Sequence, residues 1–266
     1  MSVTRRPAIP YMIPLFLALT ALLCVAAWLL GGTPFGGTPL GKERGSAANT
    51  VHAVQNSPAQ TAPITCIVID AGHGGEDGGA SSAAGLLEKD INLSVAFALR
   101  DLLEAAGISV VMTRTEDKLL YDRNVDFQGR KKVLDLAARR IVAEKTAAKY
   151  GGDSLFISIH MNAFPQTQYS GMQVWYSKGD PRSADIAKSI QTASTTLMPD
   201  NTRKIKAAGS NIYLLDRIET PAVLVECGFL SNPAEAGRLA REDYRYALAA
   251  VIFGAVVSCP AAEGTG

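Results

Sequence analysis

From residue 64 onward, short apolar runs alternate with longer amphipathic stretches. The runs have the length and the β-branched content of buried strands. They lie at 64–70, 108–113, 154–160, 171–177 and 222–227. The stretches between them space their apolar residues as one face of a helix does. They lie at 88–106, 130–150, 181–197, 233–240 and 242–257. This alternation predicts a single α/β domain with a twisted, mostly parallel central sheet flanked by helices.

The N-terminal part of the chain follows a different pattern. Two arginines, Arg5 and Arg6, precede an uncharged apolar run at 12–30, which is long enough to span a bilayer as a helix. The run ends in large residues rather than in the small residues of a cleavage site, which favours an uncleaved anchor over a cleaved signal peptide. We therefore predict that residues 1–31 are a signal anchor, with a signal peptide as the alternative.

The chain that follows this run, residues 32–62, is rich in Gly, Pro, Ser and Thr and lacks an apolar period, as a flexible linker does. The folded domain then occupies residues 63–260. Because arginines lie before the apolar run and none follows closely, the N-terminus is expected in the cytoplasm. The domain is expected to be exported and membrane-anchored through residues 12–30, or secreted if the signal is cleaved.

The charge pattern argues against a nucleic-acid-binding protein, and the cysteine spacing does not indicate a disulfide framework. The net charge is +1, and the most basic stretch, 129–140, mixes its cations with apolar residues at helical spacing, so we interpret it as the solvent-facing side of a helix and expect no nucleic-acid partner. Cys66 and Cys227 lie in apolar runs and are interpreted as buried core residues. A bridge between them would require neighbouring strands.

Four polar residues fall where predicted strands end or the following helix begins. His73 follows the first strand, Glu88 opens the next helix, His160 ends the strand SLFISIH and Glu226 ends AVLVE. Strand-to-helix connections of a parallel sheet converge at one edge, where ligands bind. Two imidazoles and one carboxylate form a common catalytic zinc shell, and a second carboxylate can carry protons.

Each of these residues also has a plainer interpretation. A histidine at a strand end is often a hydrogen-bonded structural residue, and Glu88 suits any helix N-terminus. Glu226 could pair with Arg217 or Arg203 inside the core. The glycines at 72–79 could mark a phosphate loop, although the stretch is acidic and lacks the lysine of a nucleotide-binding P-loop.

Four sequence blocks resemble one enzyme family. VIDAGHGGEDGGA, EKDINLSVAFALRDLLEAAGISVVMTRTED, LFISIHMNA and PAVLVECGFLSNPAEA follow the order found in the zinc-dependent N-acetylmuramoyl-L-alanine amidases of the family called amidase 3. The resemblance spans about residues 64–258. It implies one Zn²⁺ per chain, bound by His73, Glu88 and His160, with Glu226 as the catalytic residue. It also implies hydrolysis of the amide between N-acetylmuramic acid and the L-alanine of the stem peptide.

Further blocks are similar to the sporulation and germination branch of that family, among them SGMQVWY, DLAARR and the long stretch NTRKIKAAGSNIYLLDRIE. The implied substrate is peptidoglycan, glycan strands with stem peptides, in the spore cortex, and the implied location faces the forespore intermembrane space. Some enzymes of this branch need a lipoprotein to hold zinc, so a regulatory lipoprotein is a candidate partner. The alternatives are a vegetative cell-wall amidase, a zinc carboxypeptidase or deacetylase, and an inactive wall-binding module.

Overall fold

A computed structural model describes residues 64–122, 124, 129–151 and 153–259. The predicted anchor at 1–31 and the predicted linker at 32–62 lie outside these residues. Within the described part of the chain, no helix combines the length and the apolar character needed to cross a membrane.

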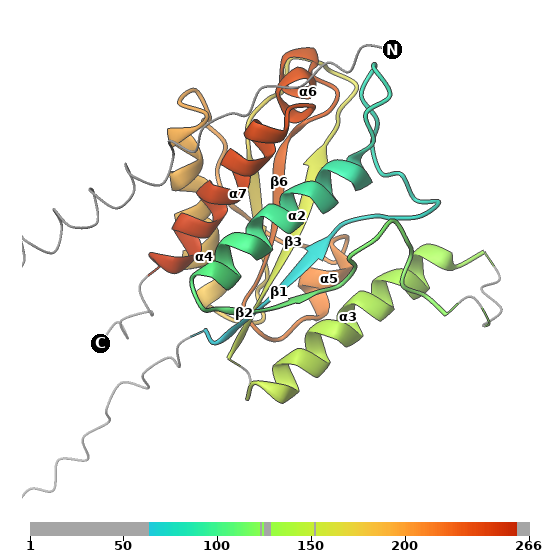
Figure 1. The fold of residues 1–266 in the computed structure, drawn as a ribbon, viewed down its shortest axis with the longest axis vertical. Helices are drawn as coiled ribbons and strands as arrows, with labels where there is room; N and C mark the ends of the chain where they lie inside the picture. The colour runs from blue at the N-terminus through green and yellow to red at the C-terminus, as the bar shows by residue number, and fades with distance from the viewer. Residues whose placement is uncertain (1–63, 123, 125–128, 152, 260–266) are drawn as a thin grey trace, which may run out of the picture. The chain divides into compact units, whose positions relative to one another are not determined.

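The described chain forms strands and helices that mostly alternate along the sequence (Figure 1). The strands are β1 (Cys66–Ala71), β2 (Ser109–Met112), β3 (Ser154–Asn162), β4 (Gln173–Tyr176), β5 (Lys206–Ala207) and β6 (Ala222–Phe229). The helices are α2 (Glu88–Ala105), α3 (Lys131–Lys149), α4 (Arg182–Ala193), the 3₁₀ helix η1 (Ser194–Thr196), α5 (Tyr213–Arg217), α6 (Pro233–Leu239) and α7 (Glu242–Val257). The predicted α/β domain is confirmed.

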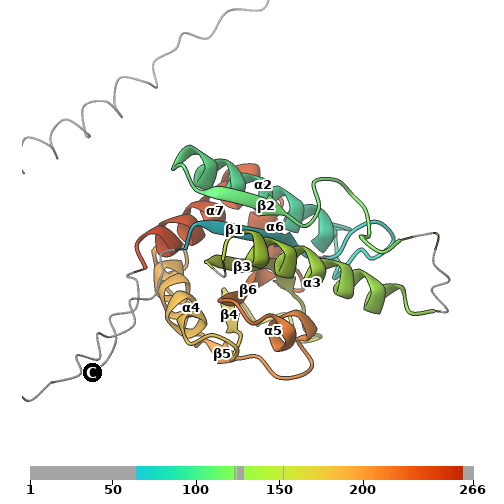
Figure 2. The same cartoon turned by 90° about the horizontal axis from the view of Figure 1, so that it is seen from below.

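The strands form one sheet in the order β2-β1-β3-β6-β4-β5. All neighbouring pairs run parallel except β4 and β6, which are antiparallel, so the sheet is mixed. Helices α2, α4 and α7 cover one face of the sheet, and α3 and α5 cover the other (Figure 2). Side chains alternate between the two cores along each strand: in β1, Ile67 and Ile69 pack under the first layer and Val68 under the second.

The register of the parallel strands decides which residues meet. Ala71 of β1 pairs with Ile159 of β3, and His160 of β3 pairs with Glu226 of β6. The C-terminal ends of β1, β3 and β6 therefore lie together, and we call this side of the sheet the functional edge. Cys66 and Cys227 do not satisfy the requirement for a bridge, because β3 lies between their strands and both thiols are free and buried.

One interpretation made from the sequence is wrong. The helical spacing of the stretch 129–140 predicts a solvent-facing side, but Asp135 and Arg139 of α3 are buried, with 4% and 1% of their surface exposed. The guanidinium of Arg139 lies 2.7 Å from both Asp135 Oδ2 and Asp70 Oδ1. The charges are buried because they neutralise one another and share hydrogen bonds.

Candidate metal centre and catalytic carboxylate

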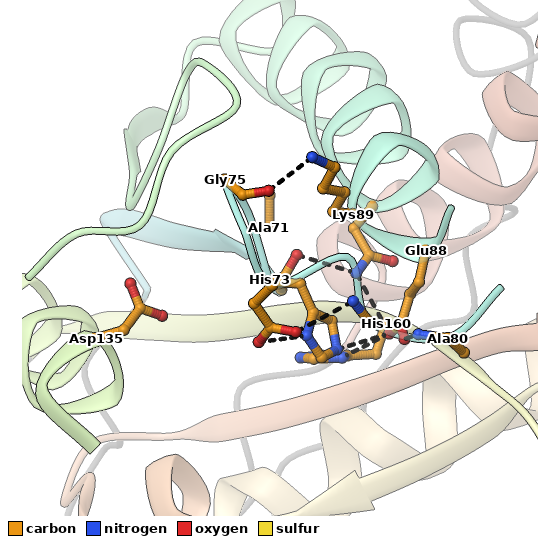
Figure 3. Close-up of polar contacts among 12 residues, drawn as sticks. Ala71, His73, Gly75, Ala80, Glu88, Lys89, Asp135 and His160 are labelled. Carbon is orange, nitrogen blue, oxygen red and sulfur yellow. Dashed lines mark hydrogen bonds and ion pairs between the residues drawn. The ribbon is translucent and has the colours of Figure 1, made fainter. Parts of the chain in front are cut away.

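The structure brings His73, Glu88 and His160 together at the functional edge (Figure 3). They come from the loop after β1, the first residue of α2 and the end of β3. Each offers one candidate ligand atom, and these atoms lie within 4.8 Å of one another. The two histidine side chains are 15% and 19% exposed and the Glu88 side chain is 4% exposed, so the group is shielded but can be reached from solvent.

Glu88 is the centre of this group. Its Oε1 lies 2.9 Å from His160 Nδ1 and 3.2 Å from His73 Nε2. The backbone N–H of Met161 donates to the same oxygen at 3.0 Å, and the N–H of Ala80 donates to Oε2 at 2.7 Å. Burial disfavours the charge, but the hydrogen bonds to His160 and His73 outweigh burial and hold the pKa of Glu88 well below its usual range.

These distances fit a zinc ion. Tetrahedral zinc with bonds of about 2.0–2.2 Å holds its ligand atoms roughly 3.3 Å apart. The contacts of Glu88 Oε1 with the two imidazoles, at 2.9 and 3.2 Å, are close to that spacing. Two imidazole nitrogens and one carboxylate also match the donor set of catalytic zinc sites, in which a fourth position stays open.

Glu226 lines the same cavity of about 230 Å³ as His73 and His160. Its Oε2 is shielded from solvent and has no hydrogen-bond partner among the described residues. Burial raises the pKa of its carboxyl to about 7. A carboxyl with such a pKa can both accept and release a proton near neutral pH.

The sequence suggested two cations as partners of Glu226, and the structure gives them other contacts. Arg217 Nε donates to Asp216 at 3.2 Å. Arg203 donates to the Ser170 carbonyl at 2.7 Å and to the Gln173 side chain at 3.4 Å. Glu226 is therefore not explained as half of a structural ion pair with either arginine.

His73 has an unusual backbone. Its φ of +61° lies in the left-handed region, which a residue with a side chain adopts only when its surroundings hold it there. Arg139 Nη2 donates to the His73 carbonyl at 2.6 Å and Nη1 donates to the Ala71 carbonyl at 2.7 Å. Arg114 donates to the carbonyls of Ala71 and Gly72 at 2.8 and 3.0 Å. Two buried guanidinium groups thus fix the chain that presents His73.

Asp77 is a candidate functional residue that the sequence pattern does not single out. Its Oδ2 lies 2.9 Å from His73 Nδ1, on the ring nitrogen opposite the one that faces Glu88. Burial lowers the pKa of His73, but the carboxylates of Glu88 and Asp77 outweigh burial and raise it. Carboxylates in this place orient metal-binding histidines and set their tautomer. The signal in the sequence that could have identified Asp77 is its spacing, because it lies four residues after the candidate ligand His73.

Two glycines make room for the group. A Cβ at Gly72 would lie 2.3 Å from the His160 ring, and a Cβ at Gly79 would lie 2.5 Å from Glu88 Oε2 and 2.7 Å from His73 Cδ2. These two positions are therefore occupied by glycine because the candidate ligands pack against the backbone there. With the carboxylates of Asp77 and Glu88 at this loop, a phosphate group would meet negative charge, so the phosphate-loop alternative is not supported.

The family model described as N-acetylmuramoyl-L-alanine amidase, Amidase_3, matches residues 67–258. The chain belongs to this family. The matched range begins at the second residue of β1 and ends just after α7, so it contains all four candidate residues and, apart from Cys66, every described strand and helix. The match gives the reaction class, amide hydrolysis in peptidoglycan, and the resemblance stated from the four sequence blocks is confirmed.

Individual relatives agree with the family. The germination-specific N-acetylmuramoyl-L-alanine amidase of Bacillus subtilis is 39% identical over 187 residues, which are 70% of this chain and 76% of that protein. A solved structure of the CwlD amidase from Clostridioides difficile, in complex with the GerS lipoprotein, matches with a TM-score of 0.67 and 36% identity, over 73% of this chain and 96% of that one. The amidase AmiC2 of Nostoc punctiforme matches with a TM-score of 0.59 and 27% identity, over 72% and 94%.

Proposed function

We propose that this amidase is zinc-dependent and that His73, Glu88 and His160 bind one Zn²⁺. The observation that carries the proposal is the contact of one Glu88 oxygen with both imidazoles at ligand-like distances. The chemistry that zinc supplies in such a shell is polarisation of a carbonyl and acidification of water. Asp77 would keep the His73 ring oriented, and the backbone N–H groups of Ala80 and Met161 would hold Glu88 in place.

Glu226 is the proposed proton carrier. Its unpartnered oxygen in the shared cavity would accept a proton from the attacking water. A carboxyl whose pKa is raised by burial to about 7 would then release this proton to the departing amine of L-alanine. The proposed products are a glycan strand with a free lactyl carboxyl group and a stem peptide that begins with L-alanine.

The test uses the purified full-length chain, peptidoglycan sacculi and mass spectrometry of the products. We expect released peptides that begin with L-alanine, loss of release with chelator and its recovery with Zn²⁺. Glu226→Gln should lower turnover by about 10²–10⁴-fold, the range for loss of a general acid or base. Shortened stem peptides still attached to the glycan would instead identify a carboxypeptidase, and chelator-resistant activity would refute zinc dependence.

We further propose that the substrate is spore peptidoglycan. The Bacillus subtilis relative named as germination-specific, 39% identical to this chain, supports this role. Expression of this chain in a Bacillus subtilis strain that lacks that relative should restore germination, and the Glu226→Gln variant should not. Failure of the active chain to restore it, with normal amidase activity in vitro, would favour a vegetative cell-wall role.

A lipoprotein partner and an exported location complete the proposal. The Clostridioides difficile CwlD amidase was solved in complex with the GerS lipoprotein, which supports a partner of that class for this chain.

The apolar run at 12–30 supports a membrane anchor with the amidase domain outside the cytoplasm. Protease added to intact protoplasts should digest the amidase domain. Its protection would contradict export.

A further inference from the structure

Two exposed aromatic side chains lie side by side on the connection between β3 and β4. The rings of Phe164 and Tyr169 pack edge to face, with centroids 5.3 Å apart and an interplanar angle of 87°. They remain 41% and 42% exposed. Aromatic rings usually bury their faces because of the apolar area they carry. Single exposed apolar residues are scattered over any protein surface and need no explanation. Two exposed aromatic rings in contact with each other are instead typical of a binding site.

The backbone of this connection is held by hydrogen bonds at both ends. The N–H of Phe164 donates to Ser231 Oγ at 3.0 Å, and Asn232 Nδ2 donates to the Tyr169 carbonyl at 3.3 Å. The two rings are therefore tied to the turn that follows β6. A surface fixed in this way loses little conformational entropy when a ligand binds.

A buried carboxylate and an arginine strengthen this support. Glu235, 2% exposed, accepts hydrogen bonds from the N–H groups of Gly171, at 3.1 Å, and Phe229, at 2.7 Å. The buried ring of Phe229 lies beneath Phe164 at a centroid distance of 5.3 Å. Arg203 lies over the Phe229 ring, with Cζ 4.4 Å from the centroid, so a guanidinium borders the aromatic pair.

The aromatic pair lies on the same edge of the sheet as the candidate catalytic residues, outside the cavity that they line. Phe164 is four residues after His160, and Phe229 is three residues after Glu226. Four residues of fully extended chain span at most about 14 Å. Because β4 runs antiparallel to β6, the connection both leaves β3 and enters β4 at the functional edge.

We propose that Phe164 and Tyr169 form a sugar-binding platform for the glycan strand, beyond the muramic acid whose amide is cut. The apolar C–H face of a pyranose ring fits flat against the electron-rich face of an aromatic ring, and because the two rings stand at 87° one of them offers its face while the other borders the bound sugar. The bordering Arg203 and the neighbouring Gln166 and Gln168 offer donors for the hydroxyl and N-acetyl groups of amino sugars. This inference rests on the proposed function for the choice of a glycan as ligand.

The test measures glycan binding without catalysis. The probe is peptidoglycan glycan strands from which the stem peptides have been removed, and the readout is the Kd for the full-length chain by calorimetry. The variant Phe164→Ala/Tyr169→Ala should bind these strands at least about tenfold more weakly. The swap Phe164→Tyr/Tyr169→Phe keeps both rings and should bind like the unchanged chain. Tyr246→Ala removes a 52% exposed ring from α7 and is the matched control.

A kinetic arm separates this proposal from the proposed function. The ratio of kcat/KM on glycan strands with stem peptides to kcat/KM on a single muramoyl dipeptide should fall about tenfold in the double alanine variant. An unchanged Kd and an unchanged ratio would refute the sugar-binding platform. The aromatic pair would then be a candidate contact site for another ligand, such as a protein. Strand binding that depends on the rings in a chain without amidase activity would support the platform and refute the proposed reaction.

Discussion

Arg139 Nη2 donates a hydrogen bond to the carbonyl oxygen of His73 across 2.6 Å, although the two residues lie 66 positions apart in the chain. The same guanidinium pairs with Asp70 and Asp135, so one buried cation connects α3, the end of β1 and the loop that presents a candidate ligand. Arg114 donates to the carbonyl of the preceding residue, Gly72, so guanidinium groups hold the chain on both sides of the left-handed backbone of His73. The geometry of the candidate metal centre thus depends on residues outside the proposed set of ligands.

Replacement of this cation should weaken zinc binding. Arg139→Lys keeps the charge but loses the planar set of donors, and we expect a loss of about 2–4 kcal/mol in the free energy of unfolding and roughly 10–100-fold in zinc affinity. Urea denaturation and competition with a chelator measure the two effects. Arg140→Lys, next to it in α3, alters only a surface pair with Glu144 and should leave both unchanged. Equal effects of the two variants would contradict the role of Arg139 in holding the loop that presents His73.

Removal of one candidate ligand should abolish zinc binding. His160→Ala should contain less than about one tenth of the zinc found in the unchanged chain by metal analysis, since the remaining imidazole and carboxylate leave a two-ligand site. Zinc bound only to the folded state raises Tm, so chelator should lower the Tm of the unchanged chain and have no effect on the variant. Glu226→Gln should keep its zinc. Stoichiometric zinc in His160→Ala would remove His160 from the metal site.

A single methyl group at Gly72 should disturb the centre by steric overlap. The Cβ of Gly72→Ala would lie 2.3 Å from the His160 ring, so the ring or the backbone has to shift from the position in which His160 contacts Glu88. We expect zinc affinity and amidase activity each to fall more than about tenfold, since ligand geometry tolerates only small displacements. Gly237→Ala in α6 has open space around its Cβ and serves as the matched control. Normal zinc affinity in Gly72→Ala would show that His160 binds zinc in another orientation.

Stability should fall in acid through Asp70. Burial raises the pKa of this carboxyl, but Arg139, Ser158 and Thr113 outweigh burial, and the folded-state pKa lies below its ordinary value. A carboxyl with a depressed pKa stabilises the fold above its unfolded pKa of about 3.9, and this contribution disappears as pH falls through the lower folded value.

The free energy of unfolding, measured in urea from pH 7 to pH 2, should therefore fall more steeply below about pH 4 in the unchanged chain than in Asp70→Asn. The variant should already be weaker at pH 7 by about 3–5 kcal/mol, because Arg139 loses its buried partner. Asp200→Asn, at an exposed position, should keep the steep fall. Identical pH profiles for Asp70→Asn and the unchanged chain would contradict this assignment.

The fold class and the four site residues could be predicted because both depend on local pattern and on one topological rule. Apolar periodicity gives strands and helices, and parallel strands bring their C-terminal ends to one edge. Pattern and rule together are enough to place His73, Glu88, His160 and Glu226 near one another. Their roles as ligands and proton carrier stay predictions until the metal and the reaction are measured.

The supporting residues could not be predicted in this way. Arg139 and Asp135 have the helical spacing of a solvent-facing side, and their burial follows from a contact with Asp70, which is 69 positions away from Arg139 in the chain. Side-chain pairs of such separation leave no periodic signal. Gly72 was visible as part of a turn, but its closeness to His160 depends on the spacing between β1 and β3.

The reversed direction of β4 has a consequence for how enzymes of this shape can diversify. A parallel β4 would need its connection from β3 to cross to the opposite edge of the sheet, usually through a helix. The antiparallel strand lets residues 163–172 connect β3 to β4 at the functional edge without crossing the sheet. Insertions or deletions in this loop would therefore change the ligand contacts that the loop can make at the functional edge, while every strand keeps its register.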